Sequence, residues 1–131
     1  MDRRMDDRVR IEQECNVYIE GTEINCTLKD ISEIGVAFEL PFQKDTYNKL
    51  QSITDLEFSY LDEFTYLGED KLTIINDSCT VARIVKKGDK IILGCRLNPN
   101  NQIKKYVKEK KVSVFLEQIN KKGKKINGTR N

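Results

Sequence analysis

The chain has 131 residues, of which 38% are hydrophobic and 34% charged, and these proportions suit one small globular domain with a solvated surface. Its 23 basic and 21 acidic residues leave a net charge of only +2, so no global field singles out a nucleic acid or a membrane as partner. No stretch has the length of a membrane span, and the polar start Met1-Asp2-Arg3-Arg4 is no secretory signal, so we expect a cytoplasmic protein without membrane insertion.

Residue types that support catalysis and metal binding are scarce. The chain contains no histidine, which removes Ser-His and Cys-His pairs as well as histidine metal ligands, and no two carboxylates are marked as a catalytic pair. We therefore expect a protein that is not an enzyme and needs no cofactor. The four cysteines form no CxxC pair and lie in β-prone runs, which favours buried thiols in a reducing cytoplasm over a zinc site: Cys15, Cys26, Cys79 and Cys95.

The first part of the chain changes from a charged leader to β-strands. Residues 1–10 are almost all charged and bury little apolar surface, so we expect a flexible N-terminal arm. From residue 11 onward, apolar and polar residues alternate. The alternation predicts a hairpin over residues 11–28 with its turn at Gly21-Thr22, a connecting turn at 29–33, and a strand at 35–40 that Pro41 ends.

The middle of the chain continues the β pattern. Residues 43–50 are polar and are expected to form a loop or a short helical turn. The following segments are expected in order: a strand at 53–61, a turn at 68–70, a long β-prone stretch at 71–85 interrupted at Asn76-Asp77, a tight turn at 87–89, and a last strand at 90–97. This many short strands at regular spacing predicts a small closed barrel or a sandwich.

The C-terminal part is expected to be helical. Asn98-Pro99-Asn100-Asn101 offers the chemistry of a helix start. Apolar residues at helical spacing then predict one helix over residues 101–119 laid against the barrel, so that residues 11–119 form the domain: Ile103, Tyr106, Val107, Val114, Phe115 and Ile119. Residues 104–125 contain nine lysines and two acids, which indicates a solvated helix face, and residues 120–131 are expected to be a disordered basic tail.

Two short motifs carry the chemistry of the chain. Arg4 and Arg8 lie four residues apart, and Asp30, Ser32 and Gly35 follow about two strands later in an Asp-x-Ser-x-x-Gly turn. Guanidinium groups bind phosphates through paired hydrogen bonds and match the O6/N7 edge of guanine, whereas a carboxylate accepts the N1–H and N2–H bonds of the opposite edge. Each motif alone is ordinary surface or turn chemistry. Together, in this order, they predict a site for a guanine nucleotide.

These residues resemble the signature of the PilZ domain, the bacterial receptor module for cyclic di-GMP. Its RxxxR motif is matched by Arg4 and Arg8, and its [D/N]xSxxG motif by Asp30, Ser32 and Gly35. The resemblance covers nearly the whole chain. It implies a mainly β fold, a six-stranded antiparallel barrel with a C-terminal α-helix. It also implies a regulatory domain that orders its N-terminal arm around cyclic di-GMP and signals to a protein partner or an attached effector domain.

The resemblance also assigns roles to the motif residues. Arg4 and Arg8 would bind phosphate and guanine, Asp30 and Ser32 would hold the other guanine, and Gly35 would shape the turn. For Gly35 two physical roles are open, a close approach of backbone to ligand or a positive φ at the end of the turn.

The residue before the first motif arginine bears on stoichiometry. Arg3 resembles an arginine of receptors that take an intercalated pair of cyclic di-GMP molecules, because its guanidinium group can stack on the extra guanine. Two ligand molecules per site are therefore expected. The two acids between the motif arginines, Asp6 and Asp7, are expected to lower the affinity for a dianion.

Two alternatives differ in class from a nucleotide receptor. A nucleic-acid-binding small barrel would use the lysine-rich helix and the arm to follow phosphates, but it needs exposed aromatic side chains between basic residues. Most tyrosines and phenylalanines of this chain instead occupy alternating, core-like positions. A degenerate PilZ domain that only docks to other proteins is the second alternative, and the intact motif residues argue against it.

Overall fold

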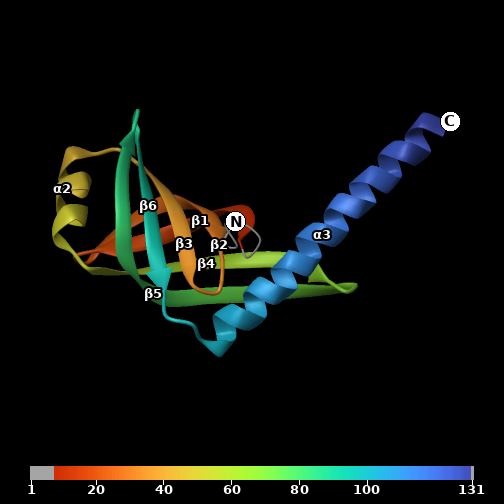
Figure 1. The fold of residues 1–131 in the computed structure, drawn as a ribbon, viewed down its shortest axis with the longest axis horizontal. Coiled ribbons are helices and arrows are strands. Elements are labelled where there is room, and N and C mark those ends of the chain that lie inside the picture. The colour runs from red at the N-terminus through yellow and green to blue at the C-terminus, as the bar shows by residue number, and fades with distance from the viewer. Residues whose placement is uncertain (1–7, 131) are drawn as a thin grey trace, which may run out of the picture.

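The computed structural model describes the backbone of residues 8–130 and the side chains of residues 8–120. Six antiparallel strands close into a barrel in the order β1-β2-β3-β6-β5-β4, with a short helix between β3 and β4 and a long helix after β6 (Figure 1). The predicted six-stranded barrel with a C-terminal helix is confirmed. Its elements are β1 (Val9–Ile19), β2 (Thr22–Ile31), β3 (Gly35–Pro41), α2 (Lys44–Ser52), β4 (Asp55–Tyr66), β5 (Glu69–Lys87), β6 (Lys90–Leu97) and α3 (Asn101–Arg130).

The interior of the barrel is filled by every second residue of its strands. Phe38 of β3 and Phe58 of β4 are fully buried at its centre, with their rings edge to face and 5.3 Å between centroids. Ile75 of β5 and Leu93 of β6 are equally inaccessible to solvent. This alternation is the period-two pattern of a sheet with one buried face, which is why the sequence indicates most strands correctly.

Several strand limits differ from the prediction. β1 begins at Val9, inside the range assigned to the arm, because this one apolar side chain is buried and pairs in register with Ile31. β5 runs without a break through Asn76 and Asp77, so the predicted interruption is wrong. Both residues keep their place in the ladder by pairing with β4, and the irregularity of β5 comes later, between Val81 and Arg83.

The β4–β5 hairpin extends beyond the closed barrel. β1 pairs with β4 only at residues 57–59, whereas β4 and β5 pair continuously from Asp55 to Tyr66. The strand predicted at residues 53–61 is therefore longer than expected. Figure 1 shows the resulting two-stranded ribbon projecting from the barrel beside α3. Because a two-stranded ribbon is marginal in water on its own, it needs a covering element.

α3 supplies that cover with its first turns. The Asn100 side chain accepts the Ile103 amide hydrogen at 2.9 Å and donates to Asp77 at 2.8 Å, so it caps the helix and ties the helix start to β5. Ile103, Tyr106 and Val107 are buried against the barrel. The predicted helix start is thus confirmed.

The second half of α3 departs from the prediction. Phe115 and Ile119 are 61% and 47% exposed, because successive residues turn by about 100° and these two lie opposite the packed side of the helix. α3 also continues to Arg130 rather than ending at Ile119, since no proline follows Pro99 and lysine is a good helix former. Across the described residues, no helix combines the length and the apolar character needed to cross a membrane.

A buried polar cluster holds α3 on β4. The Tyr106 hydroxyl donates to Asp62 at 2.7 Å, and the Lys110 ammonium lies 3.0 Å from the same carboxylate. Lys110 also lies 5.0 Å from the centre of the Phe64 ring. Burial, followed by the nearby Tyr60 hydroxyl, raises the pKa of Tyr106, so its phenol stays protonated and remains a donor at neutral pH. The Asp62 carboxylate therefore accepts the hydrogen bond of Tyr106 and balances the charge of Lys110.

All four cysteines are buried free thiols, so the predicted burial is confirmed. Cys15 and Cys26 face each other across β1 and β2. A hydrogen bond with Cys15 and then burial raise the pKa of Cys26, and a hydrogen bond with Cys95 and then burial raise that of Cys79. Thiolate, the reactive form, is disfavoured at both sites.

We expect the folded protein to react slowly with Ellman's reagent at mildly alkaline pH, and all four thiols to react once denaturant is added. Absorbance at the wavelength of the released thiolate measures both rates. Rapid reaction of two thiols in the native protein would show that one of these pairs is accessible.

Candidate functional site

The Asp-x-Ser-x-x-Gly segment forms a tight turn between β2 and β3. The Ser32 amide donates to the Gly35 carbonyl at 2.8 Å, and the Ser32 hydroxyl oxygen accepts the amide hydrogens of Gly35 at 3.0 Å and Ile34 at 3.3 Å. Ser32 is only 3% exposed, so its hydroxyl is engaged inside the turn. The Leu97 amide, which donates to the Ile34 carbonyl at 2.9 Å, fastens the turn to β6. Asp30 thus lies next to a turn that is fixed by hydrogen bonds.

The backbone of Gly35 is not in a conformation that requires glycine. Its φ lies outside the left-handed region, which among the described glycines is occupied by Gly21, Gly68 and Gly88. A Cβ at Gly35 would lie 3.4 Å from the Cys95 carbonyl oxygen and 3.8 Å from the Ser32 hydroxyl. Of the two roles open from the sequence, the positive φ is wrong, and the close approach of backbone to a ligand stays a prediction.

Arg8 and Asp30 meet at the start of β1. The Arg8 guanidinium nitrogen Nη1 lies 3.8 Å from the Asp30 carboxylate oxygen Oδ1, with the two side chains 48% and 22% exposed. The β1–β2 register explains the contact, since Val9 pairs with Ile31 and Arg10 with Asp30. One residue from each motif is thus brought into one place, although they are distant in the sequence.

The other half of the arginine motif is not placed by the structure. Arg3 and Arg4 lie outside the described residues, so RxxxR is represented by Arg8 alone. The contact between Arg8 and Asp30 is long and half exposed, and such pairs contribute about 0–1 kcal/mol. A ligand with stronger hydrogen bonds can therefore separate the two side chains at small cost.

Arg96 is a neighbour that the motifs do not indicate. It pairs with Gly35 in the β3–β6 register, and its side chain is exposed, so a second cation lies beside the turn. The alternation of residues 90–97 does mark Arg96 as outward-facing. However, that β6 lies next to β3 depends on the strand order of the closed barrel, which the local pattern does not reveal.

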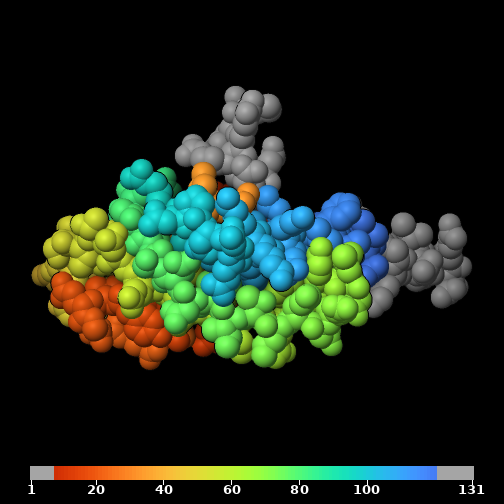
Figure 2. All heavy atoms as spheres, turned by 90° about the horizontal axis from the view of Figure 1, so that it is seen from below, coloured from red at the N-terminus to blue at the C-terminus, as the bar shows by residue number. Residues whose placement is uncertain are grey.

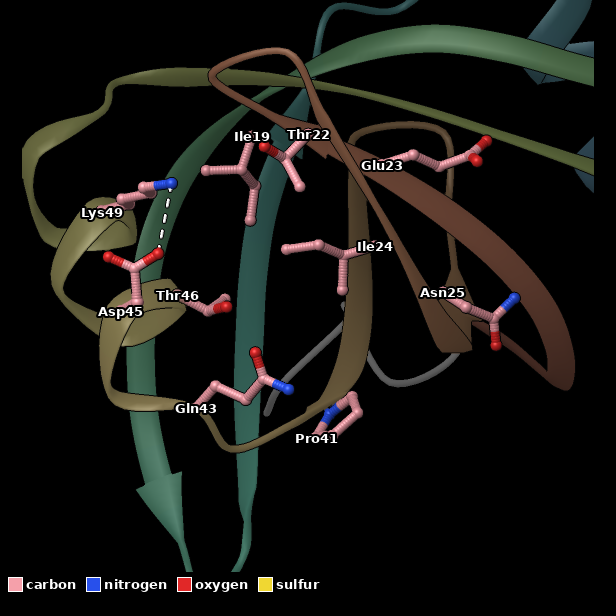
Figure 3. A pocket seen from close by; sticks show the side chains of 10 residues that line it. All are labelled: Ile19, Thr22, Glu23, Ile24, Asn25, Pro41, Gln43, Asp45, Thr46 and Lys49. Atoms are coloured by element: carbon pink, nitrogen blue, oxygen red, sulfur yellow. Dashed lines mark ion pairs between the residues drawn. The ribbon is translucent and has the colours of Figure 1, made fainter.

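A hollow on the described surface does not coincide with the candidate site. One hollow of about 360 Å³ lies between α2 and the β1–β2 hairpin, where the Lys49 ammonium pairs with Asp45 at 3.2 Å (Figure 3). None of the predicted site residues lines this hollow.

Both a known family and solved structures resemble this chain. A family model described as PilZ domain matches residues 2–109. Among solved structures, the Bacillus subtilis inhibitor of motility, MotI/DgrA, is similar with a TM-score of 0.54 and 20% sequence identity, over 87% of this chain and 50% of that chain. This likeness concerns the fold, and the chain spans about half the length of that protein. No curated protein matches the chain.

Proposed function

The chain belongs to the PilZ domain family, and on that premise we propose that it is a cyclic di-GMP receptor that regulates another protein and is not itself an enzyme. The observation that carries the proposal is the contact between Arg8 and Asp30 beside the fixed turn. It joins a fork of donors to a carboxylate acceptor, the two groups that the opposite edges of guanine require.

In this proposal each residue has a defined task. Asp30 accepts the N1–H and N2–H bonds of one guanine, while Arg8 turns from Asp30 to a phosphate or to a guanine O6/N7 edge. Ser32 supports this arrangement from within the turn through its hydrogen bonds, and Gly35 lets the backbone approach the ligand at the end of the turn. Arg4 binds from the N-terminal segment, as the family motif implies.

The mechanism is an exchange of partners. The Arg8–Asp30 pair contributes at most about 1 kcal/mol, whereas each hydrogen bond to a charged group of the ligand contributes roughly 1.5–3 kcal/mol. Several such bonds offset the cost of ordering the arginine-bearing segment, which is about 1–2 kcal/mol per residue. The ligand thus fixes residues 1–8 against the barrel and changes the surface offered to a protein partner or an attached effector domain.

Isothermal titration calorimetry with cyclic di-GMP tests the proposal, with cyclic di-AMP and GTP as controls. We expect no heat with cyclic di-AMP, because adenine presents an acceptor where Asp30 needs a donor, and weaker binding of GTP, which offers one guanine where the proposed site holds two. We further propose two molecules per chain, and Arg3→Ala should reduce this number to one. One molecule per wild-type chain would refute the paired ligand while leaving the receptor proposal intact.

The two alternatives give different results in the same experiment. No heat with cyclic di-GMP would favour a domain that only docks to proteins. Binding of single-stranded nucleic acid that weakens steeply with salt, without a cyclic di-GMP response, would favour the nucleic-acid barrel. Five of the ten aromatic side chains are buried and speak against that barrel, whereas Phe115 is exposed beside the lysines of α3 and does not: the buried five are Phe38, Phe58, Tyr60, Phe64 and Tyr106.

A further inference from the structure

The outward face of the β4–β5 hairpin carries an exposed apolar surface, here named the sheet patch and formed by Leu61, Leu72 and Ile74. Their exposed fractions are 48%, 61% and 64%. Leu61 pairs directly with Ile74, and Leu72 is the next outward residue of β5, so the three side chains are neighbours on one face. Large apolar side chains gathered in this way mark a contact surface.

The surroundings of the sheet patch are acidic. The outward positions of the two strands include Glu57, Glu63 and Asp70, all exposed, and Glu63 pairs with Leu72 itself. The other outward positions from residue 57 to residue 65 and from 70 to 78 are neutral, being Ser59, Thr65, Asn76 and Ser78. The sheet patch is thus an apolar centre flanked by carboxylates without a cation in either row.

A second apolar surface lies on α3 and is here named the helix stripe, formed by Phe115, Leu116 and Ile119. These side chains are 61%, 37% and 47% exposed. At about 100° per residue Phe115 lies opposite Tyr106 and Ile119 lies opposite Lys110, the two residues that face the barrel, and Leu116 lies at the edge of the stripe. The same outward side carries cations over the preceding turns: Lys104, Lys105, Lys108 and Lys111.

The sheet patch and the helix stripe cannot cover each other within one chain. α3 packs on the inward face of β4 through Asp62, whereas the sheet patch lies on the outward face of the same hairpin. Figure 2 shows α3 lying along the hairpin, and Figure 1 shows it leaving the barrel. Each chain therefore presents two exposed apolar surfaces, the sheet patch with carboxylates around it and the helix stripe with lysines beside it.

We propose that two copies of this chain associate reciprocally, with the helix stripe of each copy docked on the sheet patch of the other. A twofold axis repeats the contact, so both surfaces of both copies are covered and the assembly closes. Pairing two helix stripes would bring lysines against lysines, and pairing two sheet patches would bring carboxylates against carboxylates. Only the crossed arrangement joins apolar surface to apolar surface with opposite charges at the rim.

The mass of the full chain in solution, measured by sedimentation equilibrium without cyclic di-GMP, tests this assembly independently of the proposed function. We expect a dimer that weakens with added salt, since rim charges are screened. Phe115→Glu places an acid against the acidic patch, and Ile74→Lys places a cation against the lysines of α3. Each substitution should raise the dimer dissociation constant at least about tenfold.

Mixing the two variants identifies the contact. In a mixed pair one contact is wild type, and the other joins the new glutamate to the new lysine, so we expect the mixture to dimerise better than either variant alone. A helix-to-helix dimer would be weakened by Phe115→Glu only, and a sheet-to-sheet dimer by Ile74→Lys only; either result would overturn the proposal. So would a monomer at every concentration.

A matched control separates the contact from a general effect of surface charge. Val85 is 39% exposed near the other end of β5, away from both surfaces, and Val85→Glu should leave the dissociation constant unchanged. Thermal melting checks that each variant folds. If one does not, Leu116→Glu or Leu72→Lys makes the same test on the helix stripe or the sheet patch.

Discussion

Replacing Arg8 by alanine is expected to lower the affinity for cyclic di-GMP by about 100-fold while the barrel stays folded. The loss corresponds to roughly two charge-assisted hydrogen bonds, discounted for water that replaces them. The fold should hardly respond, because the Arg8 side chain is 48% exposed and its pair with Asp30 is long. Calorimetric titration and thermal melting measure the two effects separately.

Asp30→Ala should cause a similar loss of binding, since the carboxylate is the acceptor for guanine in the proposed site. Arg8→Lys should give an intermediate affinity, because it keeps the charge and loses the fork of donors. Lys87→Ala is the control, an exposed cation at the far end of β5. If Arg8→Ala or Asp30→Ala bound as tightly as the wild type, the site would have to be sought elsewhere.

Asp62→Ala is expected to reduce the free energy of unfolding by about 3–5 kcal/mol, the usual effect of breaking a buried ion pair. Its loss leaves Lys110, whose side chain is 13% exposed, without its counter-charge and leaves the Tyr106 hydroxyl without an acceptor. These two residues hold the first turns of α3 on β4. Urea denaturation followed by circular dichroism measures the change.

The stability loss of Asp62→Ala should come from the unpaired charge of Lys110 and not from the smaller volume of alanine. Lys110→Met introduced together with Asp62→Ala removes both charges, so we expect the double variant to recover part of the stability. Asp45→Ala is the control, because its pair with Lys49 is on the surface and Asp45 is 80% exposed. Equal losses for Asp62→Ala and Asp45→Ala would mean that the buried cluster does not fasten α3.

The fold could be predicted largely from local patterns. Apolar residues at every second position marked the strands, and Asn100 with Pro99 marked the start of α3, because side-chain direction and helix capping depend on near neighbours. The same patterns failed at Asn76 and Asp77, whose turn propensity is overridden by pairing with β4. The local patterns also did not predict where α3 ends.

The candidate site was identified by residue type but not by arrangement. Arg8 and Asp30 could be named from their chemistry, and the register of β1 and β2 then placed them together. Only the three-dimensional structure shows that the Ser32 hydroxyl is hydrogen-bonded within the turn. The same holds for the neighbour Arg96, because the pairing of β3 with β6 joins segments far apart in the chain.

The sequence by itself determined which side chains face inward along each strand and which residue types are available to bind a nucleotide. Only the tertiary structure decided which strands are neighbours, which side of α3 meets β4, and therefore which of its apolar residues stay uncovered. The physical reason is that side-chain direction follows from the backbone period of a single segment. The partner of a strand or helix face is instead set by the packing of the whole chain, as Phe115 and Tyr106 show on opposite sides of one helix.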